Sequence, residues 1–221
     1  MAEEYDIIVV GGGMVGATFA CALGDRPLRI AVVEPHQAPR HWEGGQFANR
    51  VSAITRATER VFRAVGAWEG MVGRQAQAYQ QMHVWDATGG GVIHFDAADL
   101  GEPNLGYIIE NRVILAALLD RMVEFENIDF LCPAEIAKLQ WGAIQRITFA
   151  DGRVISAPLV VGADGSRSRV RQEAGIETTG WGVLTCFGLF FLYGVLRAAG
   201  AIAVRIGRNR DRYPRFVVRL F

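Results

Sequence analysis

The chain opens with blocks of apolar residues separated by glycines. Residues 5–10 form a short apolar, β-branched run, and residues 11–24 continue with glycines followed by small apolar residues at helical spacing. Residues 28–34 make a second apolar run that ends in an acidic residue. This order predicts a strand, a tight turn, a helix and a second strand, which together form one βαβ unit.

The hydrophobic pattern then changes period several times. Residues 35–49 are rich in Pro, Gly and polar side chains and have no period, so they predict a long loop. Helical spacing predicts helices over 55–68 and 108–124, and alternation predicts a hairpin of 80–86 with 92–96. The remaining expected elements are strands at 128–132, 135–141 and 144–149 and a strand, turn and basic helix over 158–176.

These elements predict an α/β fold in two parts. A Rossmann-like layer is expected from residues 5–34 and about 108–176, with parallel strands and crossover helices. A second, partly antiparallel sheet is expected to be inserted between them, from about residue 78 to residue 105, and to include later strands. No strand alternation is visible after about residue 181.

Composition narrows the class of protein. With 221 residues, of which 51% are hydrophobic and 21% charged, the chain is globular rather than disordered or polytopic. The net charge of +0 divides into +6 on residues 182–221 and −6 on residues 1–181. Three widely spaced cysteines and no room for a leader before the first strand indicate a reducing, cytoplasmic location.

The first glycine turn carries the strongest local motif. Gly11-x-Gly13-x-x-Gly16 directly follows a strand, and Glu34 ends the next strand. The first glycine permits the sharp turn, the second lets the backbone approach a diphosphate, and the third permits close helix–strand packing. The Glu34 carboxylate can accept hydrogen bonds from a ribose 2′-hydroxyl, and its negative charge repels a 2′-phosphate. The motif predicts FAD or NAD rather than NADP, and a purely structural glycine turn is the alternative.

A second glycine turn follows the apolar run that ends near residue 162. Asp164 and Gly165 open a segment that carries Arg167, Arg169 and Arg171. Taken alone, an Asp-Gly pair indicates an ordinary turn as often as it indicates a binding site.

Six segments together make a more specific pattern. They are GGGMVG (11–16), NRVSAI (49–54), GAW (66–68), MHVWDA (82–87), GYIIENRVI (106–114) and VVGADGSRSRVRQEAGI (160–176). In this order they resemble the FAD-dependent aromatic hydroxylases of ubiquinone biosynthesis, within the wider class similar to para-hydroxybenzoate hydroxylase. The similarity covers about residues 5–181. It implies FAD as the tightly held nucleotide, NAD(P)H as the co-substrate that reduces it, and O₂-dependent hydroxylation of a polyprenyl phenol or quinol.

The resemblance also implies roles for individual residues. The glycine motif and Glu34 match the family's dinucleotide-binding motif. Arg50 matches the position from which the family reaches the FAD phosphates, a role that suits a guanidinium group. Asp164 and Gly165 match the Asp-Gly signature beside the FAD diphosphate and the path of the nicotinamide donor. Asn111 lies near a position that contacts the flavin, although an ordinary helix-start residue is an equal alternative.

The sequence departs from the family after residue 181. The family's third motif, a Gly-Asp turn followed by Ala-Ala-His, is absent, and residues 182–221 do not continue the expected strands. We therefore expect a truncated, N-terminal family portion over 1–181 that retains FAD weakly or not at all, followed by a non-family tail. A frameshift is one origin for this tail. The rival interpretation is a membrane anchor over 183–204, which Arg197 disfavours.

Other classes of function find less support in the sequence. His36, His41, His83 and His94 lack metal-ligand spacing, so no metal is expected, and no phosphate-binding loop or hydrolase motif is present. The negative charge of residues 1–181 disfavours nucleic acid. No catalytic residue is assigned, because the cofactor carries the oxygen chemistry. Because the implied polyprenyl substrate is hydrophobic, we expect the protein to contact the inner membrane peripherally or to join a ubiquinone-biosynthesis complex. A non-catalytic FAD-binding remnant and an NAD-dependent oxidoreductase are the alternatives.

The frameshift hypothesis predicts what the downstream DNA encodes. Translation in the other two frames should reveal the missing Gly-Asp and Ala-Ala-His motif within the family's expected spacing. Sequencing across the end of the matched region provides the measurement, and the absence of that motif from every frame would refute the hypothesis.

Overall fold

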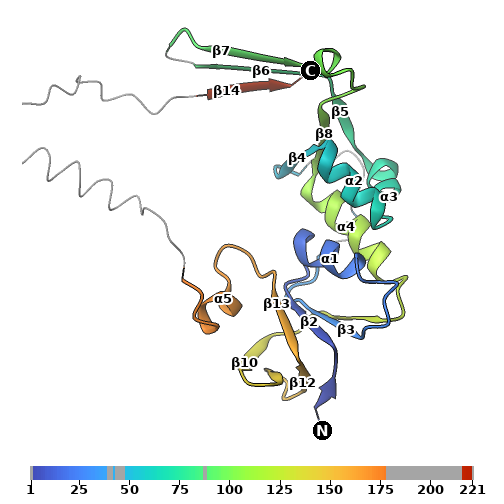
Figure 1. Ribbon diagram of the computed structural model, residues 1–221, viewed down its shortest axis with the longest axis vertical. Helices are drawn as coiled ribbons and strands as arrows, with labels where there is room; N and C mark the ends of the chain where they lie inside the picture. The colour runs from blue at the N-terminus through green and yellow to red at the C-terminus, as the bar shows by residue number, and fades with distance from the viewer. Residues whose placement is uncertain (1, 39–41, 43–47, 87–88, 178–215, 221) are drawn as a thin grey trace, which may run out of the picture.

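The computed structural model describes residues 2–38, 42, 48–86, 89–177 and 216–220. A parallel sheet of four strands, in the order β13-β2-β3-β9, lies below α1 in the view of Figure 1. These strands are β2 (Ile7–Val10), β3 (Ile30–Val33), β9 (Ile128–Leu131) and β13 (Leu159–Gly162). Every residue of β2 and β3 is buried, as expected for parallel strands that are covered on both faces.

Different layers cover the two faces of this sheet, because successive side chains of a strand point to opposite sides. Ile7 and Val9 belong to a core shared with α1 (Met14–Cys21) and α4 (Asn111–Met122). Ile8 and Val10 join a second core with the strands of a mainly antiparallel sheet, whose order is β1-β12-β11-β10. That sheet consists of β1 (Glu3–Glu4), β10 (Ile136–Gln140), β11 (Gln145–Phe149) and β12 (Val154–Ala157).

A further part of the molecule lies beyond α4 (Figure 1). It contains two small antiparallel sheets, with the orders β4-β8-β5 and β14-β6-β7. Its strands are β4 (Val51–Thr55), β5 (Gln77–Tyr79), β6 (Gln81–Asp86), β7 (Val92–Asp96), β8 (Gly106–Glu110) and β14 (Phe216–Leu220). Its helices are α2 (Arg56–Ala64), α3 (Trp68–Arg74) and the 3-10 turn η1 (Ala97–Leu100), and α5 (Arg169–Glu173) follows β13.

The first core continues into this second part. Trp68 and Met71 of α3 are almost fully buried and belong to the same cluster as Leu118 and Met122 of α4. The ring of Trp68 also meets that of Tyr107 edge to face, with centroids 4.9 Å apart. This shared packing attaches the small sheets to the layer that contains the parallel sheet.

Most of the expected elements are confirmed. The opening βαβ unit, the hairpin of β6 with β7 and the strands β9, β10, β11 and β13 form as the hydrophobic pattern predicts. The expected second, partly antiparallel layer is also present. Most of the expected loop over residues 35–49 lies outside the described residues.

Two predicted helix boundaries are wrong. The helix expected over 108–124 begins only at Asn111, because the backbone of 106–110 pairs as β8 with both β4 and β5. The helix expected over 55–68 ends at Ala64, and Gly66 then adopts a φ of +79° before α3 begins at Trp68. Strand pairing and a left-handed glycine thus override helical periodicity.

Besides β8, five strands were not expected from the pattern. They are the short strands β1 and β5, β4 in the NRVSAI segment, β12 after the Asp151-Gly152 turn and β14 in the tail. The absence of a strand after residue 181 was therefore a wrong prediction, since β14 pairs antiparallel with β6. Among the described helices, none has the length and apolarity needed to cross a membrane, and residues 183–204 lie outside the described part.

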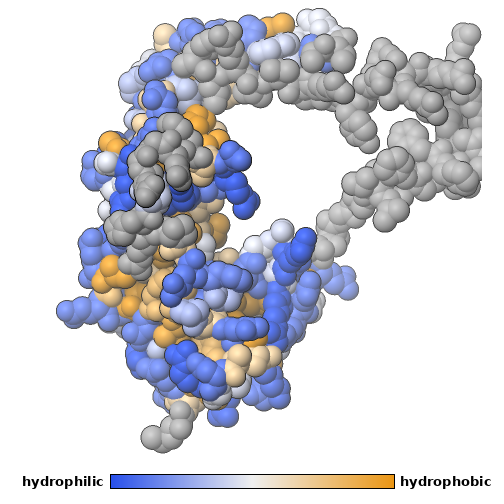
Figure 2. Space-filling model, turned by 180° about the vertical axis from the view of Figure 1, so that it is seen from behind, coloured by the Kyte–Doolittle hydropathy of each residue, from blue (hydrophilic) through white to orange (hydrophobic). Residues whose placement is uncertain are grey.

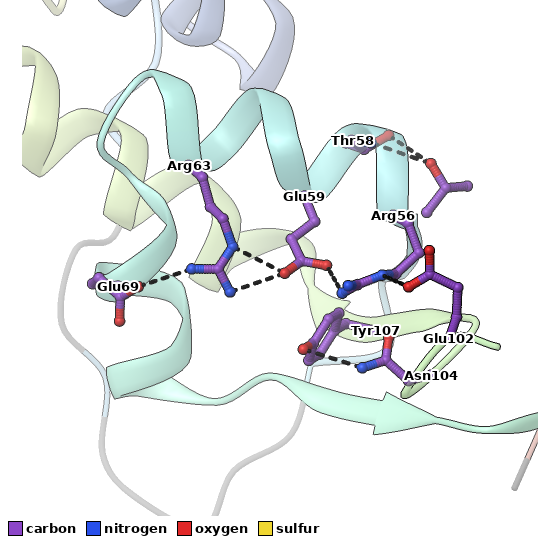
Figure 3. A network of polar contacts seen from close by, with 9 residues as sticks. Arg56, Thr58, Glu59, Arg63, Glu69, Glu102, Asn104 and Tyr107 are labelled. Carbon is purple, nitrogen blue, oxygen red and sulfur yellow. Dashed lines mark hydrogen bonds and ion pairs between the residues drawn. The ribbon is translucent and has the colours of Figure 1, made fainter. Parts of the chain in front are cut away.

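A buried carboxylate organises the surface of α2 (Figure 3). Glu59 is only 4% exposed and forms ion pairs with Arg56 and Arg63 of its own helix. Arg63 donates from Nε and Nη2 to the same Glu59 oxygen, at 3.0 and 2.9 Å, and also pairs with Glu69. The two arginines therefore compensate the burial of one negative charge.

We expect Glu59→Ala to lower the free energy of unfolding by about 2 kcal/mol, because two arginines lose their shared partner. The loss is smaller than for a fully buried pair, since the Arg56 and Arg63 side chains stay 29% and 50% exposed and keep contact with water. Urea-induced unfolding measures the change. Glu69→Ala is the matched control, because Glu69 is 82% exposed and its pair with Arg63 contributes little. Equal losses in the two variants would contradict this account.

Candidate functional site

The glycine turn between β2 and α1 is held in place by backbone contacts. Gly11 has a φ of +106°, and its N–H donates to the Val33 carbonyl at 2.8 Å, which ties the turn to the end of β3. A Cβ at Gly11 would lie 2.4 Å from the Ala163 carbonyl oxygen, so no other residue fits there without movement. The turn therefore joins the carboxyl ends of three neighbouring strands.

The other two glycines of the motif have different structural roles. Gly13 is the N-cap of α1, and an added Cβ there would meet no atom within 4 Å. Its backbone consequently borders open space at the start of the helix. A Cβ at Gly16 would lie 1.9 Å from the Gly11 carbonyl oxygen, so this glycine permits the helix to pack against the turn.

Glu34 lies directly after β3 and closes the same turn. Its Oε2 accepts the Gly12 N–H at 2.8 Å, and its Oε1 accepts the His36 N–H at 3.1 Å. Each carboxylate oxygen has two lone pairs, so both retain capacity for a further donor such as a sugar hydroxyl.

A backbone hydrogen bond joins Arg50 and Asn111, but their side chains take different positions. The Asn111 N–H donates to the Arg50 carbonyl at 3.0 Å. Arg50 is exposed and lines the cleft described below. Asn111 does not line that cleft, because its Oδ1 accepts the Ser52 hydroxyl at 2.6 Å. A flavin contact for Asn111 stays a prediction.

Asp164 and Gly165 follow β13, and Gly165 adopts a φ of +84°. The Asp164 Oδ2 accepts the N–H groups of Arg169 and Val170, at 2.7 and 3.2 Å. Burial alone would raise the pKa of the Asp164 carboxyl, but the Ser168 hydroxyl and the backbone N–H donors outweigh it and hold the pKa below its ordinary value. Asp164 is therefore an anion at neutral pH.

These segments meet around one cleft of about 930 Å³ at the carboxyl ends of β2, β3 and β13. Six of the eight predicted cofactor-binding residues line it, namely Gly11, Gly13, Glu34, Arg50, Asp164 and Gly165. Gly16 lies beneath the turn as a packing residue. The open edge of a parallel sheet is where α/β proteins bind ligands.

Five further polar or backbone groups of the cleft were missed by the sequence reasoning. They are His36, Ala134, Glu135, Ile136 and Arg169. Residues 134–136 carry no local motif. Their place could have been inferred from the rule that ligands bind beyond the carboxyl ends of parallel strands, since the predicted strand 128–132 ends just before them.

The residues of the cleft fit a dinucleotide. The first N–H groups of α1 have no capping side chain and no acidic residue in the first turn, so they and the exposed Arg50 can meet a diphosphate. Asp164 supplies a buried oxygen, Oδ1, that has no hydrogen-bond partner among the residues that the structure describes. Such an oxygen requires a donor, and a ribose or ribityl hydroxyl provides one.

A second hollow has the opposite character. It has a volume of about 560 Å³, lies between α1, β4, α2 and α4, and contains no charged residue in its lining. Val15 and Val61 line it and remain 74% and 48% exposed. Figure 2 shows that hydrophobic residues reach the surface in several places between hydrophilic ones. Without cations, this hollow does not fit a diphosphate.

Within the part of the chain that the structure describes, no group of three or more His, Cys, Asp or Glu side chains could hold a metal ion. His83 and His94 lie opposite each other on β6 and β7, with ring centroids 5.6 Å apart. His41 lies outside the described residues.

Comparison with curated proteins finds relatives in one biosynthetic pathway. Ubiquinone biosynthesis monooxygenase COQ6, mitochondrial, of Rattus norvegicus is 33% identical over 193 residues, covering 80% of this chain and 40% of that protein. The 3-demethoxyubiquinol 3-hydroxylase of Escherichia coli is 33% identical over 180 residues, covering 81% of this chain and 46% of that protein. The chain thus spans less than half the length of these relatives.

Solved structures share the fold. PqsL of Pseudomonas aeruginosa, as a four-residue mutant, superimposes with a TM-score of 0.66 at 24% identity, over 81% of this chain and 48% of that chain. The p-nitrophenol 4-monooxygenase PnpA of Pseudomonas putida gives a TM-score of 0.65 at 19% identity, over 82% of this chain and 46% of that chain. A family model described as FAD binding domain matches residues 4–193. Since this match includes most of the sequence, the chain belongs to the family of FAD-binding domains.

Proposed function

We propose that this chain binds FAD in the cleft, with the weak affinity expected of a truncated portion, and forms the FAD-binding part of a monooxygenase that hydroxylates a polyprenyl phenol or quinol in ubiquinone biosynthesis. The observation that carries the proposal is the convergence of the glycine turn, Glu34, Arg50 and the Asp164-Gly165 turn on one cleft. The names of the curated relatives, which are ubiquinone biosynthesis monooxygenases and hydroxylases, support the substrate class.

In this proposal different residues of the cleft bind the charged and the neutral groups of the dinucleotide. The start of α1 and Arg50 bind the diphosphate. Glu34 accepts a hydrogen bond from a hydroxyl of the adenosine ribose, and the Asp164 Oδ1 accepts one from a further hydroxyl of the ligand. Bound FAD supplies oxygen activation once NAD(P)H has reduced it. The protein's own contribution is to orient the cofactor and to keep its polar groups satisfied.

The substrate class also bears on location. A polyprenyl chain partitions into lipid, so we propose that the enzyme meets its substrate at the cytoplasmic face of the inner membrane, by peripheral contact or within an assembly of the pathway.

Flavin titration and turnover test the proposal in sequence. Purified chain is titrated with FAD, and the flavin absorbance and fluorescence changes give the affinity. NADH or NADPH oxidation with a polyprenyl phenol in air, with product mass measured, then tests hydroxylation. Added oxygen in the product supports the monooxygenase, and bound flavin without turnover supports a binding role alone. Binding of NAD in preference to FAD would overturn the assignment.

Asp164→Asn should weaken FAD binding about tenfold. An asparagine offers one acceptor oxygen, so it can serve either the N–H groups of α5 or the ligand, whereas the aspartate serves both. Asp151→Asn is the matched control, because Asp151 also accepts a backbone N–H, that of Arg153 at 3.0 Å, but lies at a remote exposed turn. Equal FAD affinities of the Asp164→Asn and Asp151→Asn variants would show that Asp164 does not contact FAD.

A further inference from the structure

The side chain of Arg169 connects the two walls of the cleft. Its Nη1 and Nη2 donate to the carbonyl oxygens of Ile136 and Ala137, at 2.6 and 2.9 Å. These carbonyls belong to the start of β10, while Arg169 itself begins α5 after the Asp164-Gly165 turn. One residue therefore bridges segments that are 32 and 33 positions apart in the sequence.

The carbonyls that Arg169 binds lie at an irregular point of the sheet. β10 is the outer strand in the order β1-β12-β11-β10, and its pairing with β11 shifts register between Ile136 and Lys138. A bulge locally disrupts the ladder and redirects the strand. The two donors of the guanidinium group match two adjacent carbonyls, which a single ammonium group could not do with the same geometry.

The backbone of Arg169 acts on the opposite wall. Its N–H donates to the Asp164 Oδ2 at 2.7 Å, which leaves the Asp164 Oδ1 as the free acceptor. Ile136, Asp164 and Arg169 all line the cleft. The bridge thus fixes the distance between the β10 wall and the turn that carries Asp164.

We propose that Arg169 is a positioning residue for the dinucleotide, holding the Asp164-Gly165 turn against the β10 bulge so that the cleft is preorganised before the ligand binds. The inference rests on the proposed FAD-binding role of the cleft. Preorganisation raises affinity because the ligand does not have to order the turn. The Arg169 side chain is 44% exposed, so its bonds contribute little to global stability and act mainly on the local position of the turn.

Arg169→Met tests the proposal by two measurements. FAD affinity should fall about five- to tenfold, and hydrogen exchange without FAD should become faster in peptides covering 163–170, with β2 and β3 unchanged. Arg169→Lys should give an intermediate affinity. Arg153→Met is the matched control, because Arg153 is 54% exposed and pairs with Asp151 away from the cleft. Glu173→Ala removes the Nε partner of Arg169 and spares both carbonyl bonds, so it should behave like wild type.

Each contrary result has a defined meaning. Lower affinity without faster exchange in 163–170 would make Arg169 a direct ligand contact and overturn the positioning role. Faster exchange with affinity within twofold of wild type would reduce Arg169 to a structural residue and also overturn it. If wild type and Arg153→Met both fail to bind FAD, the proposed function fails. The positioning role of Arg169 is then tested by hydrogen exchange alone, and exchange in Arg169→Met that equals that of wild type would overturn it.

Discussion

Three backbone segments approach one another more closely than side chains would allow, and the candidate site depends on that approach. Gly16 lies against the Gly11 carbonyl, and Gly11 lies against the Ala163 carbonyl, so α1 begins directly over the ends of β2 and β13. Any Cβ at either glycine would force the helix or the second turn outward. Gly13, the N-cap of α1, lines the cleft, so the positive end of the helix dipole borders it.

The charged residues of the cleft come from several different segments of the chain. Arg50 directly precedes β4, whereas Glu34 and Asp164 follow two strands of the parallel sheet. Both carboxylates also serve the protein, since they accept backbone N–H groups that fix their own turns. This double use fixes the positions of both carboxylates, and for Asp164 the hydrogen bonds also lower the pKa of the carboxyl, because they favour its charged form.

The layer that holds the cleft and the part beyond α4 form one continuous packing unit. The core around Trp68, Met71 and Leu118 joins the small antiparallel sheets to the helices above the parallel sheet. On the opposite face, the sheet that contains β10 packs on Ile8 and Val10. This sheet also supplies the Ile136 carbonyl to which Arg169 donates a hydrogen bond. Relatives of which the matched region is 40% and 46% share this part with the chain, at 33% identity.

The sequence by itself determined the parts of this protein whose cause is local. Spacing of apolar residues specified the βαβ unit, and Gly11, Gly13 and Glu34 marked the turn, because a tight turn and an acid at a strand end are properties of short segments. Resemblance to a family added Arg50 and the Asp164-Gly165 turn, which the structure brings to the same cleft.

Only the tertiary structure decided the rest. Residues 108–110 read as the start of a helix in isolation but form the end of β8, because β4 and β5 lie on both sides of that strand. Asn111 and Ser52 satisfy each other, and Arg169 reaches β10 across more than thirty residues, through contacts that no local pattern encodes. The physical reason is that hydrogen bonds between distant segments depend on how the sheets pack, which is set by the whole core at once.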